Sequence, residues 1–116
     1  MPGINKVILI GHIGKAPELR FLPGNVAVLD FPFATKDQIM KNGVRIEQTE
    51  WHNIVLLNGL AEAAYKILAP GKLIYLEGKL RTRSFVDEQT VKRYLTEVIV
   101  DHFVVLPSPK FDYRLG

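Results

Sequence analysis

The chain has 116 residues, which suits one compact domain with a single buried core. It contains no cysteine, so disulfide frameworks and thiolate metal sites are excluded and a reducing, cytoplasmic compartment is expected. Fifteen Lys and Arg against twelve Asp and Glu give a formal net charge of +3, which favours polyanionic partners. No apolar run approaches the length of a membrane span, so we expect no membrane association.

Two apolar segments near the N-terminus predict β-strands. Residues 5–14, NKVILIGHIG, have a β-branched bias and close on two glycines, which indicates a strand that ends in a bend. Residues 26–35, VAVLDFPFAT, follow the turn signal at 23–25 and predict a second strand. Both carry large apolar side chains on both faces, so we expect burial on two sides, under a helix or against another subunit.

A polar segment separates these strands from the next one. Residues 36–48, KDQIMKNGVRIEQ, contain Asn42-Gly43 and predict a hairpin connection that is longer than geometry requires. Residues 49–57 predict the third strand. Its alternation puts Trp51 on one face and His52 on the other, and does not decide which face is buried.

The periodicity then changes to that of a helix. Leu60, Ala64, Ile67 and Leu68 recur at helical spacing until Pro70-Gly71, which predicts one short amphipathic helix. Two more strands follow, at about 73–85 and 93–106, with a loop at 86–92. Three strands, a helix and two strands match an all-β, five-stranded Greek-key barrel of the OB type, a fold that commonly binds oligonucleotides or oligosaccharides. The domain is expected to span residues 1–106, and residues 107–116 a short tail.

The fourth strand carries an unusual row of side chains. In residues 79–85, KLRTRSF, alternation places on one surface Lys79, Arg81, Arg83 and Phe85. Leu80 falls on the other, core-facing surface with Ile74 and Leu76. Three cations and an exposed ring suit a single-stranded nucleic acid, with phosphates at the cations and a base on the ring. A solvated strand face with an incidental Phe explains the same pattern equally well.

No catalytic or metal-binding constellation is found. Asp37, Glu47 and Glu50 do not form a carboxylate pair suited to hydrolysis, and there is no phosphate-binding glycine loop. His12 and His102 lack short-spaced partners, so a metal site is not expected. We therefore expect a binding protein without a cofactor, rather than an enzyme.

Several segments together resemble one known family. They are INKVILIGHIGKAPELRFLP at 4–23, TEWHNIVL at 49–56, GLAE at 59–62, YLEGKLRTRSF at 75–85 and RYLTEVIV at 93–100. In this order and at these spacings they resemble the bacterial and mitochondrial single-stranded DNA-binding protein family, from about residue 4 to residue 106. The resemblance implies an OB-fold protomer, usual assembly as a homotetramer, and sequence-tolerant binding of single-stranded DNA in replication, recombination and repair at the nucleoid.

The resemblance also implies roles for individual residues. Trp51 matches a base-stacking position, Phe85 stands where a Trp is usual, and the cations of the 79–83 row match phosphate contacts. Ile39 and Leu57 fall where aromatic residues are common, so we expect weaker binding and a shorter occluded site. The full set of expected nucleic-acid-binding residues is Trp51, Phe85, Lys79, Arg81, Arg83, Ile39, Leu57, Lys6, Arg20 and Arg45.

The resemblance also bears on subunit assembly and on the recruitment of partner proteins. His52 matches a position at a subunit contact, and Val7 and Leu9 are the apolar candidates for the same interface. The last residues, PSPKFDYRLG, lack the acidic tip through which family members recruit partners, so the chain is either truncated or an accessory form for which such partners are not expected. Two alternatives remain open: a dimeric primosomal-type OB protein, and a protein-interaction OB module without strong DNA binding. A nuclease is the least favoured reading.

Overall fold

Six strands and one helix follow one another in residues 1–107, the part of the chain that the computed structural model describes. The predicted tail lies almost wholly outside these residues. The elements are β1 (Val7–Ile13), β2 (Glu18–Leu22), β3 (Val26–Lys41), β4 (Val44–Leu57), α1 (Asn58–Tyr65), β5 (Leu73–Val86) and β6 (Lys92–Val105).

The strands close into a barrel of five, with β2 added at one edge. Neighbours pair in the order β1-β5-β6-β4-β3-β2, and a β1–β3 pairing closes the ring. All pairings are antiparallel except the short one between β4 and β6. The all-β, five-stranded OB barrel expected from the sequence is therefore confirmed.

Alternating side chains of these strands fill the barrel. The largest fully buried ones are Phe33, Leu29, Ile54, Leu56, Ile74 and Leu76. The helix presents two fully buried small residues, Ala61 and Ala64, to this core, and Leu68 follows just beyond its end. The helix is shorter than the 58–71 segment in which we predicted it, and Ile67, expected on its apolar face, is half exposed.

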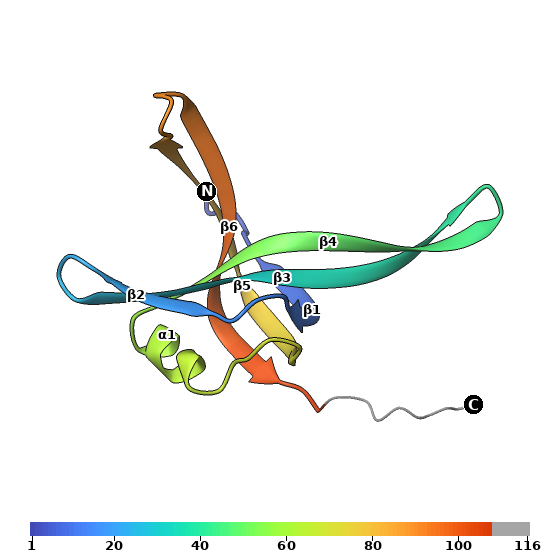
Figure 1. The fold of residues 1–116 in the computed structure, drawn as a ribbon, viewed down its shortest axis with the longest axis horizontal. Coiled ribbons are helices and arrows are strands. Elements are labelled where there is room, and N and C mark those ends of the chain that lie inside the picture. Colours follow the sequence, from blue (N-terminus) through green and yellow to red (C-terminus); the bar gives the residue numbers. More distant parts are fainter. Residues whose placement is uncertain (108–116) are drawn as a thin grey trace.

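The polar segment predicted as a long connection is instead part of two strands. The β3–β4 ladder runs without a break from Val28 opposite Leu57 to Lys41 opposite Val44. Asn42 and Gly43 alone turn the chain, both at positive φ (52° and 77°), as a tight two-residue hairpin turn requires. This ribbon projects from the barrel (Figure 1), and no other described element packs on it. Its polar composition therefore reflects exposed strands and not a loop.

The prediction also missed a strand. β2 pairs with the first half of β3, from Leu22 opposite Val26 to Glu18 opposite Asp30. Its five residues are mostly exposed and lie between Pro17 and Pro23, so neither length nor an apolar alternation marked it as a strand.

The prediction that Leu80 belongs to the core is wrong, because β5 and β6 also extend beyond the barrel. Ile74 and Leu76 are fully buried as expected, whereas Leu80 is 49% exposed. The ladder shifts at Glu77/Gly78, and past this irregularity the two strands continue as a projecting ribbon with no covering layer (Figure 1). We call residues 79–86 and 92–97 the β5–β6 arm, and residues 36–49 the β3–β4 arm.

Candidate nucleic-acid interface

The ladder register places most of the predicted binding residues on one side of the sheet. Residues paired directly across a ladder share a face. Val55 pairs with Ile99, which pairs with Lys79, so the odd-numbered face of β4 continues into the cationic row of β5. This surface, called the outer face, carries Arg20, Arg45, Trp51, Leu57, Lys79, Arg81, Arg83 and Phe85. Its floor is a small apolar cluster of Val28, Val55 and Ile99, flanked by Val26 and Leu57.

Trp51 is an exposed ring resting on backbone. Trp51 is 59% exposed, so it lies on the solvent-facing side of its strand and not in the core. A Cβ added at Gly14 would lie 2.6 Å from Trp51 Cζ3, so only glycine lets the ring approach this closely. Gly14 is itself fixed by a hydrogen bond from its N–H to the carbonyl of Pro32. The ring is therefore supported from beneath and available to solvent, as a base-stacking platform requires.

Phe85 occupies the other end of the outer face, on the β5–β6 arm. It is 42% exposed, and Arg93 lies directly opposite it in the ladder. The guanidinium carbon of Arg83 lies 6.0 Å from its ring centroid. A ring with cations beside it suits a nucleotide, whose base stacks while its phosphate meets the charge.

Arg83 is held by a buried acid. Its Nε and Nη2 donate to the two carboxylate oxygens of Glu97 at 3.0 and 3.3 Å, and Glu97 is only 7% exposed. The hydrogen bond to Glu97 raises the pKa of Arg83, which keeps the guanidinium charged. Because this ion pair partly neutralises Arg83, most of the net positive charge of the row comes from Lys79 and Arg81. Neither of these side chains forms an ion pair within residues 1–107.

Two adjoining pockets link Trp51 to the arm. One lies beside Trp51 and is lined by Gly14, Lys15, Ala16, Glu18, Asp30, Pro32 and Trp51. The other is lined by residues that include Arg20, Asn53, Arg83 and Glu97. Asp30 and Pro32 line both, so the two pockets are neighbours on the outer face. Arg20 is paired with Asp30 at 3.1 Å, which places one of the weaker sequence candidates beside these pockets.

Two expected binding residues lie elsewhere. Ile39 pairs with Ile46 in the β3–β4 arm, and alternation turns it away from the face that carries Trp51. Lys6 is paired with Glu77 at 3.0 Å, on the β1–β5 side of the barrel. Glu77 also accepts a hydrogen bond from Tyr75, which together with Lys6 lowers the pKa of the Glu77 carboxyl.

The residues expected at a subunit contact are only partly available. Val7 and Leu9 pack against the barrel core, whereas their neighbours Ile8 and Ile10 are 55% and 53% exposed. His52 is half-buried, with its Nε2 2.8 Å from the hydroxyl of Thr35. The alternation of the first strand was the signal that could have separated the inward from the outward pair.

Sequence reasoning missed two supporting residues, Gly14 and Glu97. Gly14 appeared only as the end of a strand, and nothing local in the sequence shows which ring lies over it. Glu97 lies 14 positions from Arg83, so only the β5–β6 register brings the two together.

Within residues 1–107 no three His, Cys, Asp or Glu side chains converge in a way that would hold a metal ion. The helical structure of the described residues includes no segment with the length and apolar character needed to span a bilayer.

Both the sequence and the fold of this chain match known proteins. The sequence model of the single-strand binding protein family matches residues 4–106. A single-stranded DNA-binding protein of Bacteroides thetaiotaomicron is 48% identical over 110 residues, covering 92% of this chain and 68% of that protein. The structure of a Plasmodium falciparum SSB complex with single-stranded DNA superposes with a TM-score of 0.84 at 27% identity, covering 92% of this chain and 98% of the other. A deletion mutant of the Thermus aquaticus single-stranded DNA-binding protein gives a TM-score of 0.80 at 31% identity, covering 90% of this chain and 51% of the other.

Proposed function

Because this chain belongs to the single-strand binding protein family, we propose that it binds single-stranded DNA along the outer face, without strong sequence preference. Proteins of this family are non-enzymatic, in keeping with the expectation from the sequence. The observation that carries the proposal is the pairing of two exposed rings, Trp51 and Phe85, on the one face that also carries the cationic row.

The outer face favours single strands over duplex for a physical reason. Trp51 and Phe85 offer their rings to bases, and duplex bases are already stacked on one another. Every base has a π-face, so stacking tolerates any sequence, while Lys79 and Arg81 meet the phosphates that all sequences share. The small floor of Val28, Val55 and Ile99 adds apolar contact without reading base edges.

Self-association is part of the proposal, with a homotetramer as the expected state. Within residues 1–107, residues 7–10 of β1 have ladder partners only in β5, since the β1–β3 pairing begins at His12, so this part of the chain leaves one edge of β1 open. Ile8 and Ile10 face outward from this strand, and Val104 on β6 is 41% exposed on the same side of the barrel, across from Tyr75. An open edge beside exposed apolar residues suits a second copy. Four protomers would let one DNA strand engage several outer faces at once.

Protection of exposed strands in replication, recombination and repair is the cellular role that we propose for this activity. Sedimentation of the purified chain tests its assembly: a tetramer mass supports the proposal, whereas a stable dimer favours a primosomal-type OB protein.

A titration tests the binding itself. The protein is titrated with oligo-dT and with a duplex of equal length, at low and moderate salt, and the fluorescence of Trp51, the only tryptophan, is followed. We expect strong quenching by the single strand alone, with log K falling by about 0.7 per log salt for each phosphate contacted. Absence of quenching or of any binding at low salt would contradict the proposal and favour a protein-interaction OB module.

A further inference from the structure

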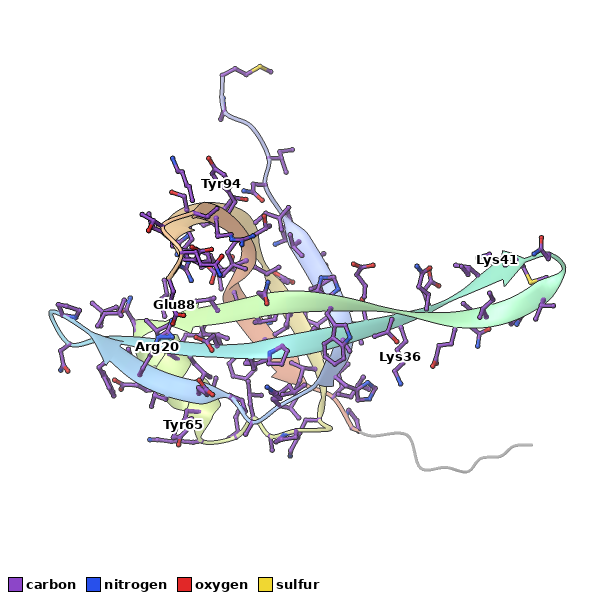
Figure 2. The ribbon with its side chains drawn as sticks, turned by 45° about the horizontal axis from the view of Figure 1, so that its top comes forward. Arg20, Lys36, Lys41, Tyr65, Glu88 and Tyr94 are labelled. Carbon is purple, nitrogen blue, oxygen red and sulfur yellow. The ribbon has the colours of Figure 1, made fainter. Side chains whose placement is uncertain are left out.

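The β5–β6 arm carries a second exposed aromatic ring, on the face opposite Phe85. Tyr94 is 68% exposed and projects from the outer part of the arm (Figure 2). It pairs with Ser84 in the ladder, whereas Phe85 pairs with Arg93, so the two rings occupy adjacent ladder positions on opposite faces of the ribbon. Neither the sequence pattern nor the outer face assigns a role to Tyr94.

This second ring has the same kind of neighbour as Phe85. The ammonium of Lys92 lies 5.7 Å from the centroid of the Tyr94 ring, just as Arg83 lies 6.0 Å from that of Phe85. Each face of the arm therefore combines one aromatic ring with one cation near its ring. A cation so placed is within reach of the phosphate of any nucleotide that stacks on the ring.

The side chains around Tyr94 present no negative charge that would repel an anionic ligand. By the register, its face of the arm carries Leu80, Thr82, Ser84, Val86, Lys92, Tyr94 and Thr96. None of these is acidic, and one is a cation. The arm's single acid, Glu97, faces Arg83, and of the two acids in the connecting loop Asp87 is paired with Arg93 at 2.8 Å.

The path between the two rings is short and open. The arm is only two strands wide, about 5 Å between strand axes. Its backbone edges have no ladder partners within residues 1–107, because the β1–β5 ladder ends at Gly78 and the β4–β6 ladder begins at Val98. Two side chains contact this backbone at the base of the arm: Asn5 bonds to Leu80, and the amide of Asn53 donates to the carbonyl oxygen of Thr96 at 3.3 Å.

We propose that Tyr94 and Lys92 form a second stacking subsite for single-stranded DNA, reached when a strand leaving Phe85 wraps around the β5–β6 arm. This inference rests on the proposed function and extends it. Short oligonucleotides fill the path from Trp51 to Phe85, and only longer ones reach Tyr94.

The test compares Tyr94→Ala with the wild type on oligo-dT of increasing length, starting below the roughly 4 to 16 nucleotides that one OB domain covers. Short oligonucleotides are expected to bind both proteins equally. Long ones are expected to bind the variant roughly 5- to 150-fold more weakly, which is the loss of one base stack. Tyr94→Phe keeps the ring and should bind as the wild type does. Val86→Ala, an exposed apolar change on the same face, is the matched control.

A direct contact measurement accompanies the titrations. Long oligonucleotides with single photoreactive uracils are cross-linked to the wild-type protein, and the modified peptides are mapped. Cross-links at Tyr94 from positions several nucleotides beyond those that reach Phe85 are expected. Lys92→Gln should reduce the salt slope for long oligonucleotides by about 0.7 and leave that for short ones unchanged.

The outcomes separate this inference from the proposed function. If the wild type binds oligonucleotides but Tyr94→Ala matches it at every length and no cross-link maps to Tyr94, the second subsite is refuted and the outer face stands. If Tyr94→Ala instead changes the oligomeric mass without DNA, Tyr94 is a protein contact, and the inference is again refuted. If the wild type binds no oligonucleotide, the proposed function fails and the inference fails with it.

Discussion

The two arms that project from the barrel are alike in backbone and different in side chains. Both are antiparallel ribbons that run past the core into solvent (Figure 1). The β5–β6 arm carries Phe85 and Tyr94, each with a cation near its ring. The β3–β4 arm carries no aromatic residue in 36–49, and its apolar residues are the aliphatic Ile39, Met40, Val44 and Ile46. The β5–β6 arm is therefore suited to stacking on bases, whereas the β3–β4 arm offers only weaker apolar contacts.

Removal of an aromatic ring from the outer face is expected to have the largest effect on DNA binding. Trp51→Ala and Phe85→Ala are each expected to weaken oligo-dT binding by about 1–3 kcal/mol, because each removes one base stack. Ile39→Ala, on the other arm, should cost less than about 1 kcal/mol, since an aliphatic side chain offers no stacking face. Equilibrium titrations followed by fluorescence anisotropy of a labelled oligonucleotide measure all three. Equal losses from Phe85→Ala and Ile39→Ala would contradict the division between the arms.

An aromatic added to the β3–β4 arm sharpens the comparison. Gln38→Trp should tighten binding to long oligo-dT by about 1 kcal/mol, because the register puts residue 38 on the face of this arm that continues from Trp51. Ile39→Trp is the matched control, because it adds the same ring on the opposite face of the ribbon. A gain from Ile39→Trp alone would mean that the DNA does not follow the outer face along this arm.

Individual segments differ in how well the sequence predicted their structure. Alternation in KLRTRSF predicted the face of Arg81 and Phe85 because local geometry fixes it. Alternation in the first strand likewise separates Ile8 and Ile10, which are exposed, from Val7 and Leu9, which pack on the core. The polar β3–β4 arm and β2 were missed, since exposed strands leave no apolar pattern. The ion pair of Arg83 with Glu97 and the support of Trp51 by Gly14 depend on register and packing between distant segments, which one sequence does not show.

The buried acid on the β5–β6 arm gives a third, smaller prediction. Glu97→Gln keeps the shape of the side chain and removes its charge, so Arg83 would no longer be neutralised by its partner. We expect the salt dependence of oligo-dT binding to steepen by about 0.7 in log K per log salt, equivalent to one added phosphate contact. An unchanged slope in the same buffer series would mean that Arg83 does not face the DNA backbone.

The smallest expected effect concerns the loop at the tip of the same arm. Asp87 accepts hydrogen bonds from the backbone N–H groups of Gln89 and Val91 and pairs with Arg93. The hydrogen bond from Arg93 is the main cause of the lowered pKa of the Asp87 carboxyl. Because the folded-state pKa is lowered, this stabilisation is present above the usual value near 4 and is lost as pH falls through the lowered one.

Asp87→Asn should therefore lower Tm by about 1–2 °C at pH 7, and the difference should shrink as the pH falls through the lowered pKa of Asp87. Thermal unfolding followed by circular dichroism at pH 7 and over a series of acidic pH values measures it. A difference that persists unchanged at low pH would show that the charge of Asp87 is not its cause.

Amide hydrogen exchange with and without oligo-dT tests the central claim most directly, because it compares the two arms in one experiment on the unmodified protein. We expect added protection at residues 79–86 and 92–97 of the β5–β6 arm and around Trp51, with little change in residues 38–47 of the β3–β4 arm. Protection concentrated in the β3–β4 arm, with none in the β5–β6 arm, would contradict the account.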